Sequence, residues 1–275
     1  MPRAEVRPLR LKVLACEVLA RHVYQRAATS PNAIDVELLE KSLHEDAAAL
    51  RAELQRRIDA TPAPPYDAIV LVYGLCNRAT EGLVARSAPL VMARAHDCIT
   101  LYLGSRERYE AEFETHPGTY YFSADYLERG KNGSLGGGEQ DDSGMAFSAR
   151  LPTEYEALAR RYGEDNARYL AEVYGAWQRH YDRAAFIDLP CSRCPTESPG
   201  GCEHAAPYRR RAARMAEKNG WQYVHLEGDL GLVDRLLDGA WSSPGVSSPD
   251  ILVIPPGMAI FASFDERVMV AAQQP

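Results

Sequence analysis

Short, almost continuous apolar runs alternate with amphipathic helical patterns along most of this chain. The runs at 9–16 (LRLKVLAC), 67–74 (DAIVLVYG) and 89–94 (PLVMAR) have the length and composition of strands buried on both faces. Helical patterns alternate with them, including a short helix at 79–88 and a longer one at 98–114. The alternation predicts an α/β fold, a Rossmann-like parallel sheet with helices on both faces.

The second half of the chain returns to this alternation after an interruption. Residues 131–144 (KNGSLGGGEQDDSG) are rich in glycine and acid and predict a mobile loop, and helical patterns follow it. We therefore expect two α/β lobes with a helical segment between them. The expected division is a lobe at 1–128, a mobile loop at 129–150, and a helical segment with the second lobe at 151–275, which contains a cysteine-rich loop at 190–206.

Net charge and cysteine content restrict the partners and the compartment. A formal net charge of −7 gives no broad attraction for phosphate backbones, so we expect no nucleic-acid partner. No apolar stretch approaches the ~20 residues of a membrane span, and the first residues do not resemble a signal peptide. We expect a cytoplasmic protein without a membrane partner. Its six cysteines are then reduced and available for metal ligation, catalysis or burial.

Three cysteines each follow a predicted strand. Cys16 follows KVLA, Cys76 follows IVLVYGL, and Cys98 follows LVMARAHD. The carboxyl ends of parallel strands meet at one edge of a sheet, where α/β proteins bind ligands. One such cysteine alone is more often a packing residue, but three at equivalent strand ends predict a metal site.

Three thiolates leave one coordination position open on zinc or on one iron of a [4Fe-4S] cluster. We favour the cluster over zinc because no fourth protein ligand is evident. His96 and His44 are candidates for a fourth ligand or for acid–base catalysis, and Asp97 for orienting an imidazole or accepting its proton. The alternatives are an ordinary polar role for His96 and helix capping for His44.

Basic and hydroxyl residues near the His-Asp-Cys stretch suggest an anionic substrate. Arg94 ends a predicted strand, and Ser105 and Arg106 follow the helix that begins near Cys98. A guanidinium binds carboxylate or phosphate with two hydrogen bonds. We expect these three residues to bind a small anionic substrate, with a solvated helix face as the alternative.

A second group of soft ligands lies in the proline- and glycine-rich loop CSRCPTESPGGCEH. Its CxxC-x7-CxH spacing predicts a second metal site, with zinc favoured over an iron–sulfur cluster or a loop without metal. This site could be separate, or it could lie at the same sheet edge as the first one. Its expected ligands are Cys191, Cys194, Cys202 and His204.

Several motifs together resemble one protein family. The stretches KVLACEVL, LHED, YDAIVLVYGLC, RAHDCITLYLGSRERY and EGDLGLVDRLLDGAW with ILVIPPG look like the bacterial and archaeal family called domain of unknown function 1638. The most specific pieces are ACE at 15–17, GLC at 74–76 and HDC at 96–98. The resemblance is weakest between about 130 and 208, and the loop at 191–204 is not part of the pattern. It implies that these three motifs form the family's site, in a setting of corrinoid-dependent methyltransferase systems.

Three functions agree with these observations. The first is a lyase- or transferase-type metalloenzyme acting on a small anionic substrate at Cys16, Cys76 and Cys98, in one-carbon or corrinoid-linked methyl metabolism. The second is an accessory protein that binds a metal or corrinoid for a corrinoid methyltransferase protein and performs no chemistry. The third is cysteine nucleophilic or redox catalysis without metal, with Cys98 activated by His96.

Overall fold

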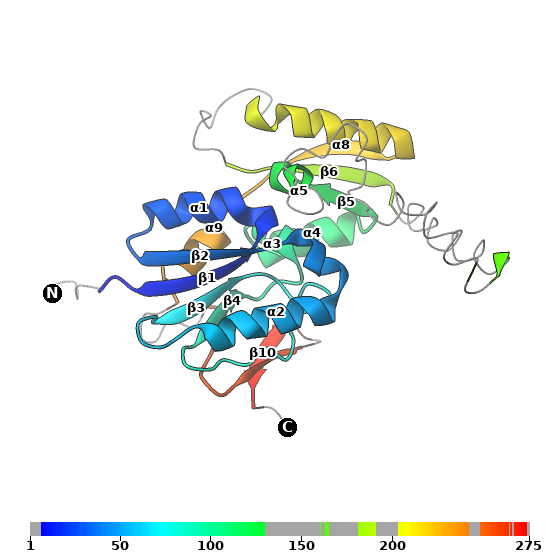
Figure 1. The fold of residues 1–275 in the computed structure, drawn as a ribbon. Coiled ribbons are helices and arrows are strands. Elements are labelled where there is room, and N and C mark those ends of the chain that lie inside the picture. The colour runs from blue at the N-terminus through cyan, green and yellow to red at the C-terminus, as the bar shows by residue number, and fades with distance from the viewer. Residues whose placement is uncertain are drawn as a thin grey trace. The chain divides into compact units, whose positions relative to one another are not determined.

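The computed structural model describes residues 7–129, 160, 163–164, 181–190, 203–241, 248–263, 265 and 267–273. The chain forms two compact units (Figure 1). The first unit combines Met1–Glu110 with Gly228–Pro275, and the second unit is Ala111–Glu227.

The first unit contains the five-stranded sheet that the apolar runs predict. Its strands, in spatial order, are β2 (Ala33–Leu39), β1 (Arg10–Cys16), β3 (Ala68–Val72), β4 (Leu90–Ala93) and β8 (Ile251–Ile254). The first four are parallel and β8 is antiparallel to β4. Strands β9 (Ala259–Ala262) and β10 (Met269–Ala272) form an antiparallel pair. The expected α/β class, a sheet rich in parallel strands and covered by helices, is confirmed.

The helices of the first unit cover both faces of this sheet. Helix α1 (Ala20–Thr29) and helix α2 (Ala47–Ala60) lie on opposite faces, and α9 (Gly231–Leu237) packs beside α1 and against β3 and β4 (Figure 1). The chain passes from β1 to β2 through α1 and returns across β1 to β3 through α2. The direction of winding therefore reverses between β1 and β3, and ligands of such sheets bind at this reversal, outside the carboxyl ends of the strands.

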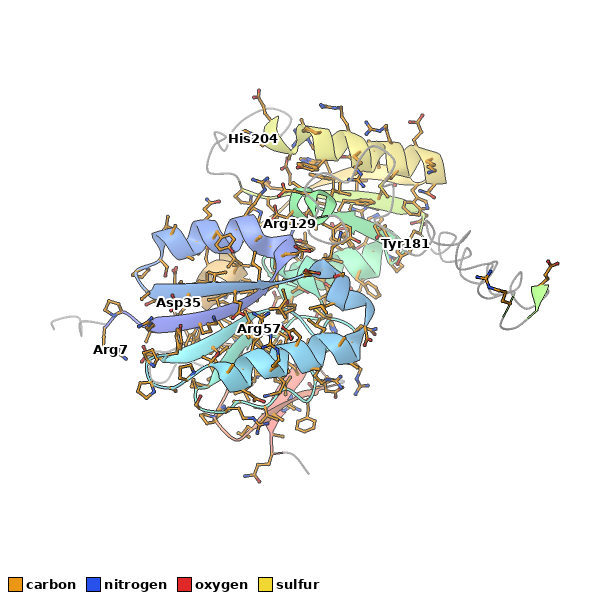
Figure 2. The ribbon with its side chains drawn as sticks, viewed as in Figure 1. Arg7, Asp35, Arg57, Arg129, Tyr181 and His204 are labelled. Carbon is orange, nitrogen blue, oxygen red and sulfur yellow. The ribbon has the colours of Figure 1, made fainter. Side chains whose placement is uncertain are left out.

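Burial follows position in the sheet. All five residues of the central β3 are buried, whereas only Leu39, the last residue of the edge strand β2, is buried. At this edge Glu37 of β2 forms an ion pair with Lys12 of β1 at 2.8 Å and another with Arg57 of α2, which is labelled in Figure 2. The apolar centre thus fixes the strand order, and charges at the rim hold α2 beside β2.

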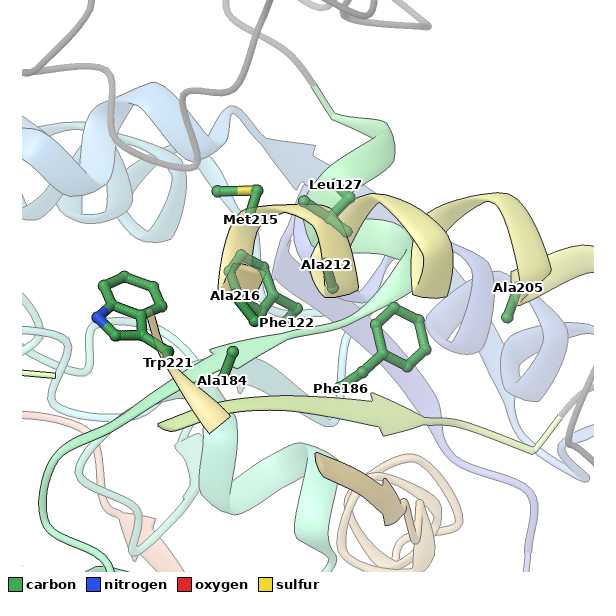
Figure 3. Packing of buried hydrophobic residues seen from close by; sticks show 9 residues of the cluster. All are labelled: Phe122, Leu127, Ala184, Phe186, Ala205, Ala212, Met215, Ala216 and Trp221. Atoms are coloured by element: carbon green, nitrogen blue, oxygen red, sulfur yellow. The ribbon is translucent and has the colours of Figure 1, made fainter. Parts of the chain in front are cut away.

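The second unit has its own parallel sheet, in the order β5 (Thr119–Phe122), β6 (Arg183–Asp188) and β7 (Gln222–Glu227). Helix α5 (Ala124–Glu128) follows β5, and helix α8 (Ala206–Asn219) packs on β6 and β7. Figure 3 shows the core of this unit. Phe122 and Phe186 from the sheet pack there with Ala212 and Met215 from α8, so a second α/β lobe exists.

The boundaries of the units differ from the expected 1–128 and 151–275. Strand β8 pairs with β4, and α9 packs against the same sheet, so the chain returns to the first unit after residue 227. Pairing between distant strands was not visible in the sequence. The expected mobile loop at 129–150 and the helical segment after it lie almost wholly outside the described residues.

Two expected helices also differ. Residues 79–88 form turns and a single bridge instead of a helix. The helix expected at 98–114 is divided into α3 (Cys98–Leu103) and α4 (Arg106–Thr115). Gly104 separates them with a φ of 78°, and a Cβ there would lie 2.7 Å from the Cβ of Asp229, so only glycine fits this left-handed position.

Helices α2 and α8 are 14 residues long, which corresponds to roughly 21 Å. The hydrocarbon core of a bilayer is about 30 Å thick. Within the described ranges, no helix has both the length and the apolar character that crossing a membrane requires.

Candidate metal centre

The three cysteines of the first unit follow three neighbouring parallel strands. Cys16 is the last residue of β1, Cys76 lies in the loop after β3, and Cys98 is the first residue of α3, after β4. Because β1, β3 and β4 are adjacent in the sheet, the thiols share its carboxyl edge at the reversal of winding. Cys16 and Cys76 are buried, Cys98 is partly exposed, and all three are free.

Main-chain hydrogen bonds join the GLC motif to the HDC motif. The amide of Leu75 donates to the carbonyl oxygen of Ala95 at 2.8 Å, and the amide of Cys76 donates to that of His96 at 2.9 Å. The loops after β3 and β4 therefore continue the ladder of the two strands. A Cβ on Gly74 would lie 2.6 Å from the amide nitrogen of Asp97, so this close approach requires glycine.

The loop that carries Cys76 is held in an unusual conformation. Cys76, Asn77 and Arg78 have φ angles of 49°, 56° and 63°, so three successive residues other than glycine are left-handed. Each such residue costs about 1–2 kcal/mol. Conformations of this kind persist where the surrounding structure enforces them, and they cluster at functional sites.

Asp97 organises the helix that begins at Cys98. One carboxylate oxygen accepts a hydrogen bond from the amide of Ile99 at 2.9 Å, and the other accepts one from the hydroxyl of Tyr109 at 3.2 Å. Asp97 is therefore the N-cap of α3. Burial raises the pKa of Asp97, and these hydrogen bonds partly offset the effect. These contacts hold the Cys98 loop in place, and the carboxylate also lies within electrostatic range of His96 and His44.

The ACE motif connects the remaining parts of the site. The hydroxyl of Tyr102 in α3 donates to the carbonyl oxygen of Val18 at 2.8 Å, which joins the helix of Cys98 to the turn after Cys16. The carboxylate of Glu17 is buried and accepts a hydrogen bond from the amide of Lys41 at 2.8 Å. The turn after β1 is thus held on both sides, by α3 and by the 3-10 helix Lys41–Glu45 that follows β2.

The thiols are close enough to influence one another electrostatically. Burial, with smaller contributions from neighbouring charges, raises the pKa of Cys16 to about 11. Burial also raises the pKa of Cys76 and of Cys98. The charge of Cys16 raises the pKa of Cys76 further, and the charges of Asp97 and then of the other two thiols raise that of Cys98. Three thiolates cannot coexist in such a place without a positive charge, because each disfavours the ionisation of the others.

The donor set fits a soft metal, whereas the spacing does not fit a single ion. Three sulfurs on one tetrahedral zinc lie roughly 3.8 Å apart, since each Zn–S bond is about 2.3 Å. In the part of the chain that the structure describes, no three His, Cys, Asp or Glu side chains lie together at metal-binding spacing. The thiols therefore share an edge without forming the ligand cage of one ion.

The two candidate histidines have different surroundings. His44 lies partly buried in the 3-10 helix Lys41–Glu45, within electrostatic range of Asp97, and burial lowers its pKa. It does not cap α2, because Asp46 does so by accepting from the amides of Ala48 and Ala49. His96 is exposed, with its ring centroid 6.3 Å from that of Tyr109.

The residues expected to bind an anion all have structural contacts. Arg94 donates to the carbonyl oxygens of Arg267 and Met269. Arg106 lies 3.6 Å from the carboxylate of Asp250, and Ser105 accepts a hydrogen bond from the amide of Arg108 in the first turn of α4. Arg94 thus holds β10, Arg106 holds the chain just before β8, and Ser105 holds the first turn of α4. An additional role of these residues in substrate binding stays a prediction.

The expected second metal site lies mostly outside the described residues, which exclude Cys191, Cys194 and Cys202. His204, labelled in Figure 2, is exposed in the 3-10 helix just before α8. The second site stays a prediction.

Sequence reasoning gave no individual role to two residues of the first site, Tyr73 and Glu17, although Glu17 belongs to the ACE motif. Both are buried next to the cysteines, Tyr73 directly before GLC and Glu17 within ACE. Both residues are polar and stand where an apolar strand meets a cysteine motif, and this position was the sequence signal that could have identified them.

The family model described as "Protein of unknown function (DUF1638)" matches residues 38–237. The match contains the GLC and HDC motifs and the loop at 191–204, and it begins after ACE. Comparison with curated proteins and with solved structures gave no match. The family resemblance predicted from the motifs is confirmed.

Proposed function

The chain belongs to the family of proteins of unknown function DUF1638, and we propose that it is a metal-dependent enzyme with its metal held by Cys16, Cys76 and Cys98. A small substrate takes the coordination position that three thiolates leave open. The reaction is of the lyase or transferase type.

One observation carries this proposal. The three cysteines lie at the carboxyl ends of adjacent parallel strands, where the winding of the sheet reverses. Ligand sites of doubly wound sheets lie at this place, whatever their chemistry. The main-chain bonds between GLC and HDC and the left-handed turn at Cys76 support it, because they restrict the thiol positions before any ligand binds.

We favour a [4Fe-4S] cluster over zinc. The thiolates of a cluster bind different iron atoms and therefore lie farther apart than three sulfurs on one ion. Three cysteines without an evident fourth protein ligand would leave one iron of a cluster open, and this supports the cluster. When bound, the cluster supplies a Lewis-acid position or an electron to the substrate.

The protein side chains have separate tasks in this proposal. Asp97 and Gly74 keep the loops of Cys98 and Cys76 together. His44 is the imidazole that burial keeps neutral, so it can accept a proton. His96, which is exposed, is the second candidate for acid–base catalysis.

The setting of the reaction is also part of the proposal. The family resemblance supports a role in one-carbon or corrinoid-linked methyl metabolism, with a small anionic substrate and a corrinoid methyltransferase protein as partner. Thiol ligands that must stay reduced support a cytoplasmic location. The net charge of −7 supports the absence of a nucleic-acid partner.

Differential alkylation of the cysteines tests which of them hold metal. Anaerobically purified protein is treated with iodoacetamide before and after removal of the metal with a chelator, and each cysteine is quantified by mass spectrometry. Both labelling reactions are carried out in a denaturant that unfolds the protein. We expect Cys16, Cys76 and Cys98 to stay protected from iodoacetamide while metal is bound. After the chelator has removed the metal, we expect all three to react together. Labelling of these three residues that is independent of the chelator would contradict the proposal, whatever the loop at 191–204 does.

A further inference from the structure

Tyr73 is a buried polar residue at the candidate metal site, and the proposed function assigns it no role. It directly follows β3, and only 2% of its surface is exposed. Ala15 of β1 pairs with Val72 of β3, so the next residues, Cys16 and Tyr73, lie side by side on the opposite face of the sheet. The phenol is within electrostatic range of Cys16, Cys76 and Glu17. Tyr73 therefore lies where the winding of the sheet reverses, between β1 and β3.

The hydroxyl of Tyr73 has no hydrogen-bond partner among the described residues. Buried tyrosine hydroxyls normally have one, and leaving such a group unsatisfied costs free energy. The same site shows the normal case, since the buried hydroxyl of Tyr102 donates to the carbonyl oxygen of Val18. The Tyr73 hydroxyl is an unsatisfied donor beside two candidate metal ligands. A bound molecule that accepts its hydrogen bond would explain why no protein group does so.

The state of the phenol determines its role. The ordinary pKa of a tyrosine phenol is about 10, so the hydroxyl carries its proton at neutral pH. A protonated phenol donates a hydrogen bond to a lone pair. The partner must therefore present an acceptor atom close to Cys16.

We infer that the Tyr73 hydroxyl donates a hydrogen bond to an oxygen or nitrogen atom of the small molecule that occupies the open metal position. This inference rests on the proposed function and adds a residue that binds and orients the substrate. It also restricts the substrate, which needs a hydrogen-bond acceptor next to its metal-binding atom.

The test compares Tyr73→Phe with Tyr102→Phe, which removes a hydroxyl of the same kind from a satisfied position nearby. Metal content is measured first in the full-length protein, and zinc, where it is the metal found, is exchanged for Co²⁺ to give a visible spectrum. Azide serves as the probe, and its dissociation constant is obtained from the spectral change. The urea midpoint of the metal-free proteins is measured alongside.

We expect full metal content in Tyr73→Phe and azide binding weakened roughly tenfold, which is about 1.4 kcal/mol. We expect wild-type azide affinity in Tyr102→Phe. The urea midpoint should be unchanged or higher in Tyr73→Phe, which loses an unsatisfied hydroxyl, and lower in Tyr102→Phe.

Other outcomes overturn the inference in distinguishable ways. Wild-type azide affinity in a metal-loaded Tyr73→Phe protein removes the role of the hydroxyl and leaves the proposed metal site intact. Loss of metal in Tyr73→Phe alone means that the hydroxyl supports a sulfur ligand instead of the substrate. A wild-type protein that holds no metal, or that holds metal without binding azide, overturns the metal site or its open position together with this inference.

Discussion

The amide of Cys76 donates a hydrogen bond to the carbonyl oxygen of His96 at 2.9 Å. Two cysteine-bearing loops, far apart in the sequence, are thereby held together by main chain instead of by flexible side chains. The arrangement depends on Gly74, where the chain approaches Asp97 too closely for any Cβ. Preorganisation of this kind is expected of a site that must hold its ligands before the ligand arrives.

Replacing Gly74 by alanine should separate these two loops. The added Cβ would lie 2.6 Å from the amide nitrogen of Asp97, and both atoms belong to packed main chain. We expect a loss of about 2 kcal/mol or more in the free energy of unfolding, together with a reduced metal content. The control is Gly220→Ala, at a left-handed position with open space after α8, which should cost about 1 kcal/mol and leave the metal in place. Equal stability and equal metal content in the two variants would argue against the close approach.

The capping role of Asp97 predicts different effects for two substitutions. Asp97→Ala removes the acceptor for the amide of Ile99 and should lower the unfolding free energy by about 1–2 kcal/mol, whereas Asp97→Asn keeps an acceptor and should retain most of it. Urea denaturation of both variants measures the difference, with Asp46→Ala at the N-cap of α2 as a comparison. If the asparagine variant loses as much stability as the alanine variant, the charge of Asp97 matters more than its capping.

We expect substitution of Arg94 to affect the stability of the fold more than the binding of an anion. Its guanidinium donates to the carbonyl oxygens of Arg267 and Met269, so Arg94→Met should lower the unfolding free energy by about 1–2 kcal/mol and leave the metal content unchanged. Inorganic phosphate binding, followed by calorimetry, separates this role from substrate binding. Unchanged stability with lost phosphate binding would restore Arg94 as an anion ligand.

The partly buried His22 of α1 should make the first unit sensitive to acid. Burial, with a smaller contribution from Arg21, lowers the pKa of His22 from 6.5 to about 4. Between these two values the unfolded chain binds a proton that the folded chain does not, so stability falls as the pH falls through this window. Acidification from pH 7 to pH 5 should cost about 2 kcal/mol at this residue.

Urea midpoints at the two pH values measure this effect in wild type and in His22→Gln, which has no charge to gain. The pH-dependent loss should be smaller in His22→Gln, while His116→Gln, at an exposed histidine, should behave as wild type does. The same pH dependence in all three proteins would exclude His22 as its source.

Local sequence patterns predicted the strands, and contacts between distant segments produced most of the differences. The apolar runs predicted β1, β3 and β4 because burial on both faces leaves a clear signal. The antiparallel pairing of β8 with β4 left no local signal, so the last residues were expected in the wrong unit. Strand order decided which cysteines meet, and no pattern in a single sequence specifies that order.

Side-chain roles were harder to predict than positions. The cysteines could be placed at strand ends because a strand end is a local feature. Arg94 and Asp97 contact distant main chain and a helix N-terminus, which residue type alone does not reveal. Tyr73 was overlooked because a tyrosine at the end of a buried strand looks like packing until its hydroxyl is found without a partner.

Metal and acid-labile sulfide analysis of anaerobically purified protein tests the central claim most directly. Wild type is compared with a Cys16/Cys76/Cys98→Ser variant and with a Cys191/Cys194/Cys202→Ser control, and visible spectra are recorded for all three. We predict iron, sulfide and a broad visible absorption that disappear in the first variant and persist in the control; zinc with the same dependence would keep the site and change its metal. Metal that is unchanged in the first variant and lost in the control would contradict the claim that Cys16, Cys76 and Cys98 form the metal centre.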